Sequence, residues 1–394
     1  MQDLKVLGTV ENIKDAKAER LPDLSAEGEY ARISNVPIYE NGLFHSHSQY
    51  EGVVHTSYRY GADAYLNLYN GGKTNIKIAE EKKENEIAKE QKNLTLSEMK
   101  LRATAYYLDL QRSMIFKDLL LKDISTQEKQ LEEIRQLLKN GVVLKSDVLR
   151  ATLKLSRQKM ALVQLDNDIA IANQKLNILT GMPDETIVET MDDSKTDLPA
   201  LKTYADYLTE ATANSFAFKI SEKEGELRML QLKEVKANVA FKLGLFANYT
   251  YSYPQIMLFP YSVALYGLGS TGIKASFPIS SFYHNAHKTK AAEIRSQIQE
   301  VEHADTQDKI RQEVNEAFLR YREALTRITV AQENIGQATE NLRIVNNTYF
   351  NQLALVTDLL DADTQVLQTR FDYAAARIAA RLQFYQLQKA LGNL

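Results

Sequence analysis

The residues 351–362, NQLALVTDLLDA, decide the fold, because residues 140–151, NGVVLKSDVLRA, are a second version of the same stretch. The asparagine, aspartate, leucine and alanine at the first, eighth, tenth and twelfth places are identical in the two copies. Each copy lies between two long helical patterns that contain no proline, so each marks a point where one helix ends and the next begins. A repeat of this length predicts a duplicated module in which a long helix reverses and packs back on itself.

Apolar residues recur every seven positions after each reversal. This spacing is the seam of a left-handed coiled coil, because a slightly under-wound helix keeps every seventh residue facing its partner. The first copy has Val148, Leu155, Leu162, Ile169 and Leu176, and the second has Leu359, Val366, Tyr373, Ala380 and Leu387. Both reversals are therefore predicted to join long helices that pack side by side.

The composition excludes several classes of protein. The 394 residues include 48 basic and 51 acidic side chains, a net charge of -3, so no nucleic-acid footprint is present. The absence of cysteine excludes disulfides, thiolate metal sites and thiol catalysis. No run of 18 apolar residues predicts a membrane-spanning helix, which leaves a membrane β-barrel open. Met1 is not followed by the basic start and apolar core of a secretory signal, so we expect a signal to have been removed or the natural start to lie upstream.

Two pairs of segments alternate between apolar and polar residues and interrupt the helical pattern. They cover about 22–34 with 54–68, and 243–251 with 263–277. Such alternation predicts antiparallel strands with one apolar and one polar face. An apolar face that meets lipid requires a sheet that closes on itself, because an open edge leaves polar backbone groups unpaired. Four strands are too few for a channel, whereas three chains would supply twelve.

The chain divides into seven predicted segments. They are 1–21, the end of a helix in a first repeat that is short at its start; 22–69, a strand pair with an extracellular loop; 70–181, a long helical hairpin; 182–200, a linker or equatorial segment; 201–240, a helix; 241–279, a second strand pair with an extracellular loop; and 280–394, a second long helical hairpin.

The whole arrangement resembles the TolC family of outer-membrane efflux proteins. The resemblance rests above all on the reversals 141–151 and 352–362. It also rests on the strand-to-helix corner 68–73, on the equivalent corner 282–287 in the second half, and on Leu21–Leu24 at the start of the first strand. It implies a mostly α fold with a membrane β-barrel, in which three chains form an α-helical tunnel capped by a 12-stranded barrel.

The resemblance also implies a function and partners. The chain would be the exit duct of a tripartite efflux or type I secretion system, exporting small molecules or proteins. It would lie in the outer membrane of a Gram-negative bacterium with the tunnel in the periplasm. Its partners would be two further copies of itself, outer-membrane lipid, a periplasmic adaptor protein and an inner-membrane pump, but no nucleic acid.

In this family, aspartates on the inner hairpin ring the closed periplasmic aperture. The matching residues are Asp358 and Asp361, and a spacing of three places both carboxylates on one helix face. Repeated three-fold, they would favour cations in the pore, and their repulsion would raise some of their pKa values. The alternative is that acids near a helix start only favour the helix dipole, and for Asp147 this alternative weighs as much as a functional role.

The resemblance places a polar latch and an adaptor contact at the reversals. The latch would be Tyr349 facing Ser146 and Asp147, joined by a hydrogen bond from the tyrosine to an acid. Ala354 stands where an arginine is common in the family, which predicts a weaker closed state. The adaptor-contacting tips would be Gly141, Val142, Val143, Gln352, Leu353 and Ala354.

No catalytic residues, metal ligands or cofactors are predicted. His45, His47 and His55 lack the ligand spacing of a metal site, and a solvated loop explains them better. No serine, histidine and acid arrangement has a motif around it, so an enzyme is not expected. The alternative from another class is a soluble coiled-coil scaffold with the strand pairs as small capping elements. The sequence does not separate drug, metal and protein export.

Overall fold

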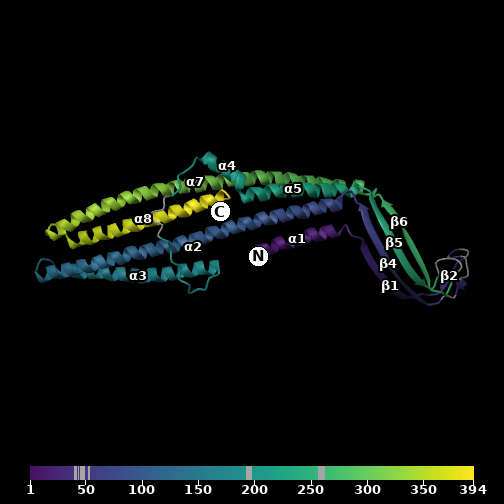
Figure 1. Ribbon diagram of the computed structural model, residues 1–394, viewed down its shortest axis with the longest axis horizontal. Coiled ribbons are helices and arrows are strands. Elements are labelled where there is room, and N and C mark those ends of the chain that lie inside the picture. The colour runs from purple at the N-terminus through teal and green to yellow at the C-terminus, as the bar shows by residue number, and fades with distance from the viewer. Residues whose placement is uncertain (40–41, 43, 45–48, 52–53, 192–197, 256–261) are drawn as a thin grey trace. The chain divides into compact units, whose positions relative to one another are not determined.

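The computed structural model describes residues 1–39, 42, 44, 49–51, 54–191, 198–255 and 262–394 (Figure 1). The elements in chain order are α1 (Gln2–Ala18), β1 (Asp23–Arg32), β2 (Val36–Ile38), β3 (Gln49–Glu51), β4 (Thr56–Tyr69), α2 (Lys73–Lys139), α3 (Lys145–Thr180), α4 (Tyr204–Asn214), α5 (Phe216–Lys236), the 3-10 turn η1 (Ala237–Val239), β5 (Lys242–Tyr253), β6 (Tyr266–Ser276), α6 (Ser281–His284), α7 (Ala286–Phe350) and α8 (Val356–Ala390).

The chain packs as two compact units, each built from two separate stretches of sequence. One comprises Met1–Lys89 with Ile220–His303 and contains the sheet. The other comprises Glu90–Lys219 with Ala304–Leu394 and contains both helical reversals. The fold class predicted from the sequence, mostly helical with a small antiparallel sheet, is confirmed.

The four long strands form one antiparallel sheet in the order β1-β4-β5-β6 (Figure 1). Tyr60 lies opposite Tyr251, and their rings stack with centroids 5.1 Å apart. Gly269 lies opposite Tyr249, and a Cβ on this glycine would come within 2.5 Å of the tyrosine ring. The ring of Tyr249 therefore lies over Gly269 on this face of the sheet. A larger residue at position 269 would clash with the ring.

The opposite face of the sheet is polar. Ser25, Asp63, Asn248 and Ser270 lie in register across the four strands. The Ser270 hydroxyl donates a hydrogen bond to Oδ1 of Asn248 at 2.6 Å. Because successive residues of a strand point to opposite faces, the apolar and polar faces follow directly from the alternating sequence. β1 and β6 are the outer strands, each with one neighbour.

The long helices that follow the two strand pairs begin with the same motif. Asn70 lies just before α2, and its Nδ2 donates a hydrogen bond at 3.0 Å to the hydroxyl of Thr74 in the first turn of that helix. Asn285 does the same to Thr289 at 3.2 Å at the start of α7. Asparagine here satisfies groups that a helix start leaves without partners. The duplication therefore includes the starts of the long helices.

The structure differs from the sequence-based prediction in two places. Within 22–69, the loop expected between the two strands contains the short antiparallel pair β2 and β3. The helix expected over 201–240 is divided at Ser215, whose ψ of 123° ends α4 before α5 begins. A Cβ on Gly392 would lie 2.5 Å from the carbonyl oxygen of Asn214, so the end of the chain packs against this break. Such tertiary packing carries no local sequence signal.

Candidate functional site

The first reversal joins α2 to α3 through a left-handed residue. Gly141 has φ 75°, which is favourable for glycine because it has no Cβ. Its N–H donates to the carbonyl of Leu138 at 3.0 Å, and the N–H of Val142 donates to that of Leu137 at 2.9 Å. This pair of bonds is the Schellman motif, which satisfies the last carbonyls of α2 and ends the helix.

The second reversal joins α7 to α8 with the same backbone but without glycine. Gln352 has φ 64°, and its N–H donates to the carbonyl of Tyr349 at 2.8 Å. The N–H of Leu353 donates to that of Thr348 at 2.9 Å. A side chain in the left-handed region is disfavoured by about 1 kcal/mol or more relative to glycine. The duplicated backbone is therefore preserved here at some cost in strain.

An aspartate fixes the first turn of the helix after each reversal. The N–H of Leu144 donates to Oδ2 of Asp147 at 3.1 Å, and the N–H of Leu355 donates to Oδ2 of Asp358 at 3.1 Å. Both acids thus stabilise a helix start, as the simpler interpretation of the sequence predicts. This bond occupies one oxygen of Asp358, so it is compatible with a second role for the exposed carboxylate.

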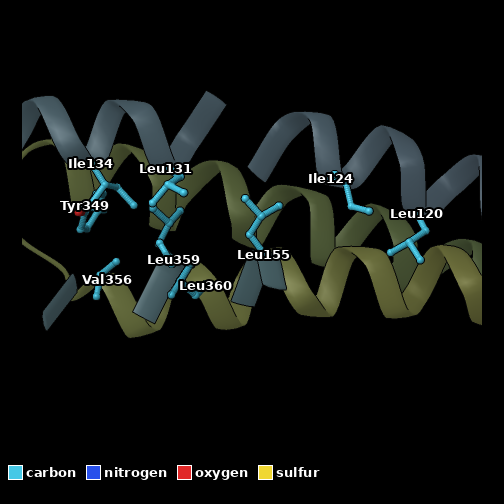
Figure 2. Packing of buried hydrophobic residues seen from close by; sticks show 10 residues of the cluster. Leu120, Ile124, Leu131, Ile134, Leu155, Tyr349, Val356, Leu359 and Leu360 are labelled. Carbon is cyan, nitrogen blue, oxygen red and sulfur yellow. The ribbon is translucent and has the colours of Figure 1, made fainter. Parts of the chain in front are cut away.

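A single hydrophobic core joins the two reversals (Figure 2). The side chains come from four helices, α2, α3, α7 and α8. In Figure 2 these side chains lie between the helices. Its buried members are Leu120, Ile124, Leu131, Ile134, Ala151, Leu155, Tyr349, Val356, Leu359 and Leu360. The core brings together the two stretches that the sequence singles out, and it anchors the start of α8.

The proposed ring acids lie on the solvent side of this anchored helix. Asp358 and Asp361 are exposed, whereas Leu359 and Leu360 between them are 0% and 7% exposed. The buried pair fixes the rotation of α8 about its axis, since turning it would expose both leucines. The direction of the two carboxylates is therefore set by packing.

Tyr349 is part of the core, with 6% of its surface exposed. The hydrogen bond predicted from its hydroxyl to an acid is not formed, because the hydroxyl has no hydrogen-bond partner among the described residues. Burial, followed by the charge of Asp147, raises the pKa of Tyr349 above its ordinary value of 10.0. Asp147 thus acts on the hydroxyl through space, while Ser146 is exposed.

The tip residues divide into an exposed and a packed set. Val142 and Leu353 are 39% and 79% exposed, and the turn residues Gly141 and Gln352 are exposed beside them. Val143 and Ala354 instead pack against the shared core. A protein that binds the tips would meet the first set, and replacing the second set would disturb packing.

Sequence reasoning missed a buried polar cluster next to this core. Asp363 is 7% exposed and accepts a hydrogen bond from Nε2 of Gln127 at 2.9 Å. Lys154 approaches the same carboxylate from α3. An available signal was that Asp363 interrupts the apolar stripe between Leu359 and Val366, where an acid has to be paired.

Within the described residues, no group of three or more histidine, aspartate or glutamate side chains could hold a metal ion. His45 and His47 lie outside those residues, and Nδ1 of His55 lies 2.8 Å from the carbonyl oxygen of Ile33. None of the described helices has the length and apolar character needed to cross a membrane.

The family model described as outer membrane efflux protein matches residues 6–182 and 208–393. The match includes both helical hairpins and both strand pairs. No curated protein matches the chain.

Solved structures of outer-membrane channels share the fold. CusC is 17% identical with a TM-score of 0.80, and the alignment covers 100% of this chain and 88% of that one. VceC from Vibrio cholerae is 16% identical with a TM-score of 0.75, covering 100% and 92%. The open state of MtrE from Neisseria gonorrhoeae is 16% identical with a TM-score of 0.76, covering 99% and 85%.

These findings confirm the resemblance stated from the sequence and the localisation it implied. Members of this family are channels of the outer membrane and not enzymes, and they act with an adaptor and an inner-membrane pump. The alternative of a soluble coiled-coil scaffold is therefore set aside. The chain belongs to the outer membrane efflux protein family.

Proposed function

We propose that three copies of this chain form the exit duct of a tripartite efflux or type I secretion system. The duct carries small molecules or proteins from the periplasm across the outer membrane, and the helical reversals gate it. The seven segments predicted from the sequence serve as its parts, with the strand pairs in the membrane and the two long hairpins as the wall of the periplasmic tunnel.

The observation that carries the proposal is the open sheet. Among the described residues, β1 and β6 each have one edge without a neighbouring strand, and large apolar side chains on the sheet are exposed. Leu24, Tyr30 and Ile273 are 73%, 76% and 68% exposed. Exposed apolar surface with open edges favours association, and in a lipid environment every backbone group needs a partner. Twelve strands from three chains, joined β6 to β1, meet both requirements.

The gate is assigned to the second reversal. Asp358 and Asp361 are exposed on a helix whose rotation is fixed by buried leucines, which supports their placement as a ring of carboxylates around a three-fold axis. Tyr349 serves as a latch by packing its ring into the shared core, where the charge of Asp147 acts on its hydroxyl, and Ser146 is proposed as the exposed member of the latch. The exposed tip residues Gly141, Val142, Gln352 and Leu353 bind the adaptor, with Val143 and Ala354 supporting them.

The test is biochemical and electrical. The protein is extracted from membranes with detergent, its mass is measured, and it is added to planar lipid bilayers. We expect a particle of three chains and discrete conductance steps. A monomer that stays in the soluble fraction and conducts no ions would contradict the proposal.

A further inference from the structure

A lysine of the first hairpin reaches the backbone of the second. Lys154 on α3 donates from Nζ to the carbonyl oxygen of Leu360 on α8 at 2.6 Å. The same ammonium lies 3.8 Å from Oδ2 of Asp363, and the two side chains are 15% and 9% exposed. The contact is thus a buried ionic link between the hairpins. It falls at the residue between the buried Leu359 and the ring acid Asp361.

Helix α2 completes the cluster. Nε2 of Gln127 donates to Oδ2 of Asp363 at 2.9 Å, so α2 holds the same carboxylate oxygen that the lysine of α3 approaches. Asp123 of α2 accepts a hydrogen bond from Gln158 of α3 and interacts electrostatically with Lys154. Asp361 and Arg370, both on α8, also interact electrostatically with this cluster. One ammonium therefore faces one buried carboxylate, Asp363, and one half-buried carboxylate, Asp123.

Burial makes each of these charges dependent on the others. A charge removed from water is strongly disfavoured unless it is paired, and deleting one member leaves the others unpaired. Moving α8 away from α3 breaks the bond to Leu360 and the pairing with Asp363 together. The start of α8 is therefore held by a polar contact with fixed geometry as well as by hydrophobic packing, which is less directional.

We propose that Lys154 is a positioning residue for the gate, fixing the first two turns of α8 against α3 and α2. It thereby sets where Asp358 and Asp361 stand. The inference rests on the proposed function in one respect, since a gate is needed for this positioning to control transport. The helix-to-helix contact itself is a property of the chain.

The cluster also gives the packed arrangement a pH dependence. Burial raises the pKa of Asp123. The charge of Asp363 raises this pKa further, whereas the charges of Lys154 and Arg370 lower it. A carboxyl whose pKa is raised by packing favours the packed state while protonated, and the contribution is lost as the pH rises through that raised pKa. Burial lowers the pKa of Lys154 from its ordinary value of 10.5, and the charges of Asp363, Asp123 and Asp361 oppose this shift. Acidification should hold α8 more tightly.

A single introduced thiol reports on this contact, because the chain has no cysteine. Ala362 of α8 is 4% exposed, so Ala362→Cys should react slowly with a maleimide until α8 opens. In this background we expect Lys154→Met to speed labelling at least about tenfold, since opening no longer breaks the buried link. Lys154→Arg, which keeps the charge and a donor, should label like the parent.

The matched control is Lys159→Met. Lys159 lies on the same helix and pairs with Glu128 of α2 at 2.7 Å, but the side chains are 55% and 50% exposed, so its loss should leave labelling unchanged. Asp363→Asn is a second variant, useful if Lys154→Met does not assemble. It keeps an acceptor for Gln127 and removes the charge that faces Lys154, and it should also speed labelling.

The pH arm uses labelling relative to Leu353→Cys, a thiol at a position that is 79% exposed. The ratio for Ala362→Cys should fall as the pH is lowered from neutral, and Asp123→Asn should remove the trend.

The proposal is overturned if Lys154→Met and Asp363→Asn label as slowly as the parent, if Lys159→Met labels as fast as Lys154→Met, or if Asp123→Asn keeps the trend. Conductance separates the two proposals: a parent protein that conducts no ions while labelling differences persist contradicts the gate and leaves the role of Lys154 intact.

Discussion

The two reversals share a backbone and differ in what covers the helix that follows. Leu149 and Leu360 hold the same place in the repeat, yet the first is 60% exposed and the second 7%. Arg150 likewise stands where the second copy has Asp361. Duplication has kept the turn geometry, which depends on local hydrogen bonds, while packing and charge have diverged. This divergence supports the proposal that the second copy forms the gate and the first copy supports it.

The largest expected difference between the copies lies in those leucines. Leu360→Ala removes a side chain from the shared core and should lower the free energy of unfolding by about 2–5 kcal/mol. Leu149→Ala removes an exposed side chain and should change it by less than about 0.5 kcal/mol. Denaturant unfolding of the purified proteins in detergent measures both. Equal losses would show that the first copy is covered to the same degree as the second in the assembled protein.

A smaller difference is expected at the turns. Gly141→Gln puts a side chain at φ 75° and should destabilise by about 1–2 kcal/mol, because the left-handed region disfavours a Cβ. Gln352→Gly relieves that strain but increases the conformational entropy of the unfolded chain. The net change in the free energy of unfolding should therefore lie within about 1 kcal/mol of zero. The comparison is made by thermal unfolding of both variants. If Gln352→Gly is the more damaging change, the glutamine side chain has a role that the backbone does not reveal.

The smallest effect is expected at the tyrosine hydroxyl. Tyr349 occupies the place of Leu138 in the first copy, and its hydroxyl is without a partner in the part of the chain that the structure describes. Tyr349→Phe keeps the packed ring and should leave stability within about 0.5 kcal/mol and conductance unchanged. Tyr349→Ala, which removes the ring, should raise conductance. A higher conductance of Tyr349→Phe would instead support the hydrogen-bonded latch that the sequence predicts.

Much of the fold could be predicted from periodicity. The long helix α2 follows from a helical pattern that contains no proline and ends at the first reversal, and the strands follow from alternation. The break at Ser215 could not be predicted, because it depends on contact with Gly392 at the other end of the chain. The pair β2 and β3 lies in a stretch too short for periodicity to indicate strands.

The candidate site shows the same division. Asp147 and Asp358 could be found because the repeat aligns them at helix starts, and the structure gives each a matching backbone bond. Lys154 and Asp363 could not, because their meeting depends on how one hairpin packs against the other. Spacing within one helix carries no information about such a pair.

Ion selectivity distinguishes a gate at the second reversal from a supporting role at the first. Asp358→Asn with Asp361→Asn removes the charges while asparagine can still accept the bond from Leu355. Asp147→Asn is the matched change in the first copy. Reversal potentials across planar bilayers in a salt gradient should shift away from cation preference for the double variant and stay at the parent value for Asp147→Asn. An unmoved potential in the double variant, or an equal shift in Asp147→Asn, would show that the second reversal is not the gate.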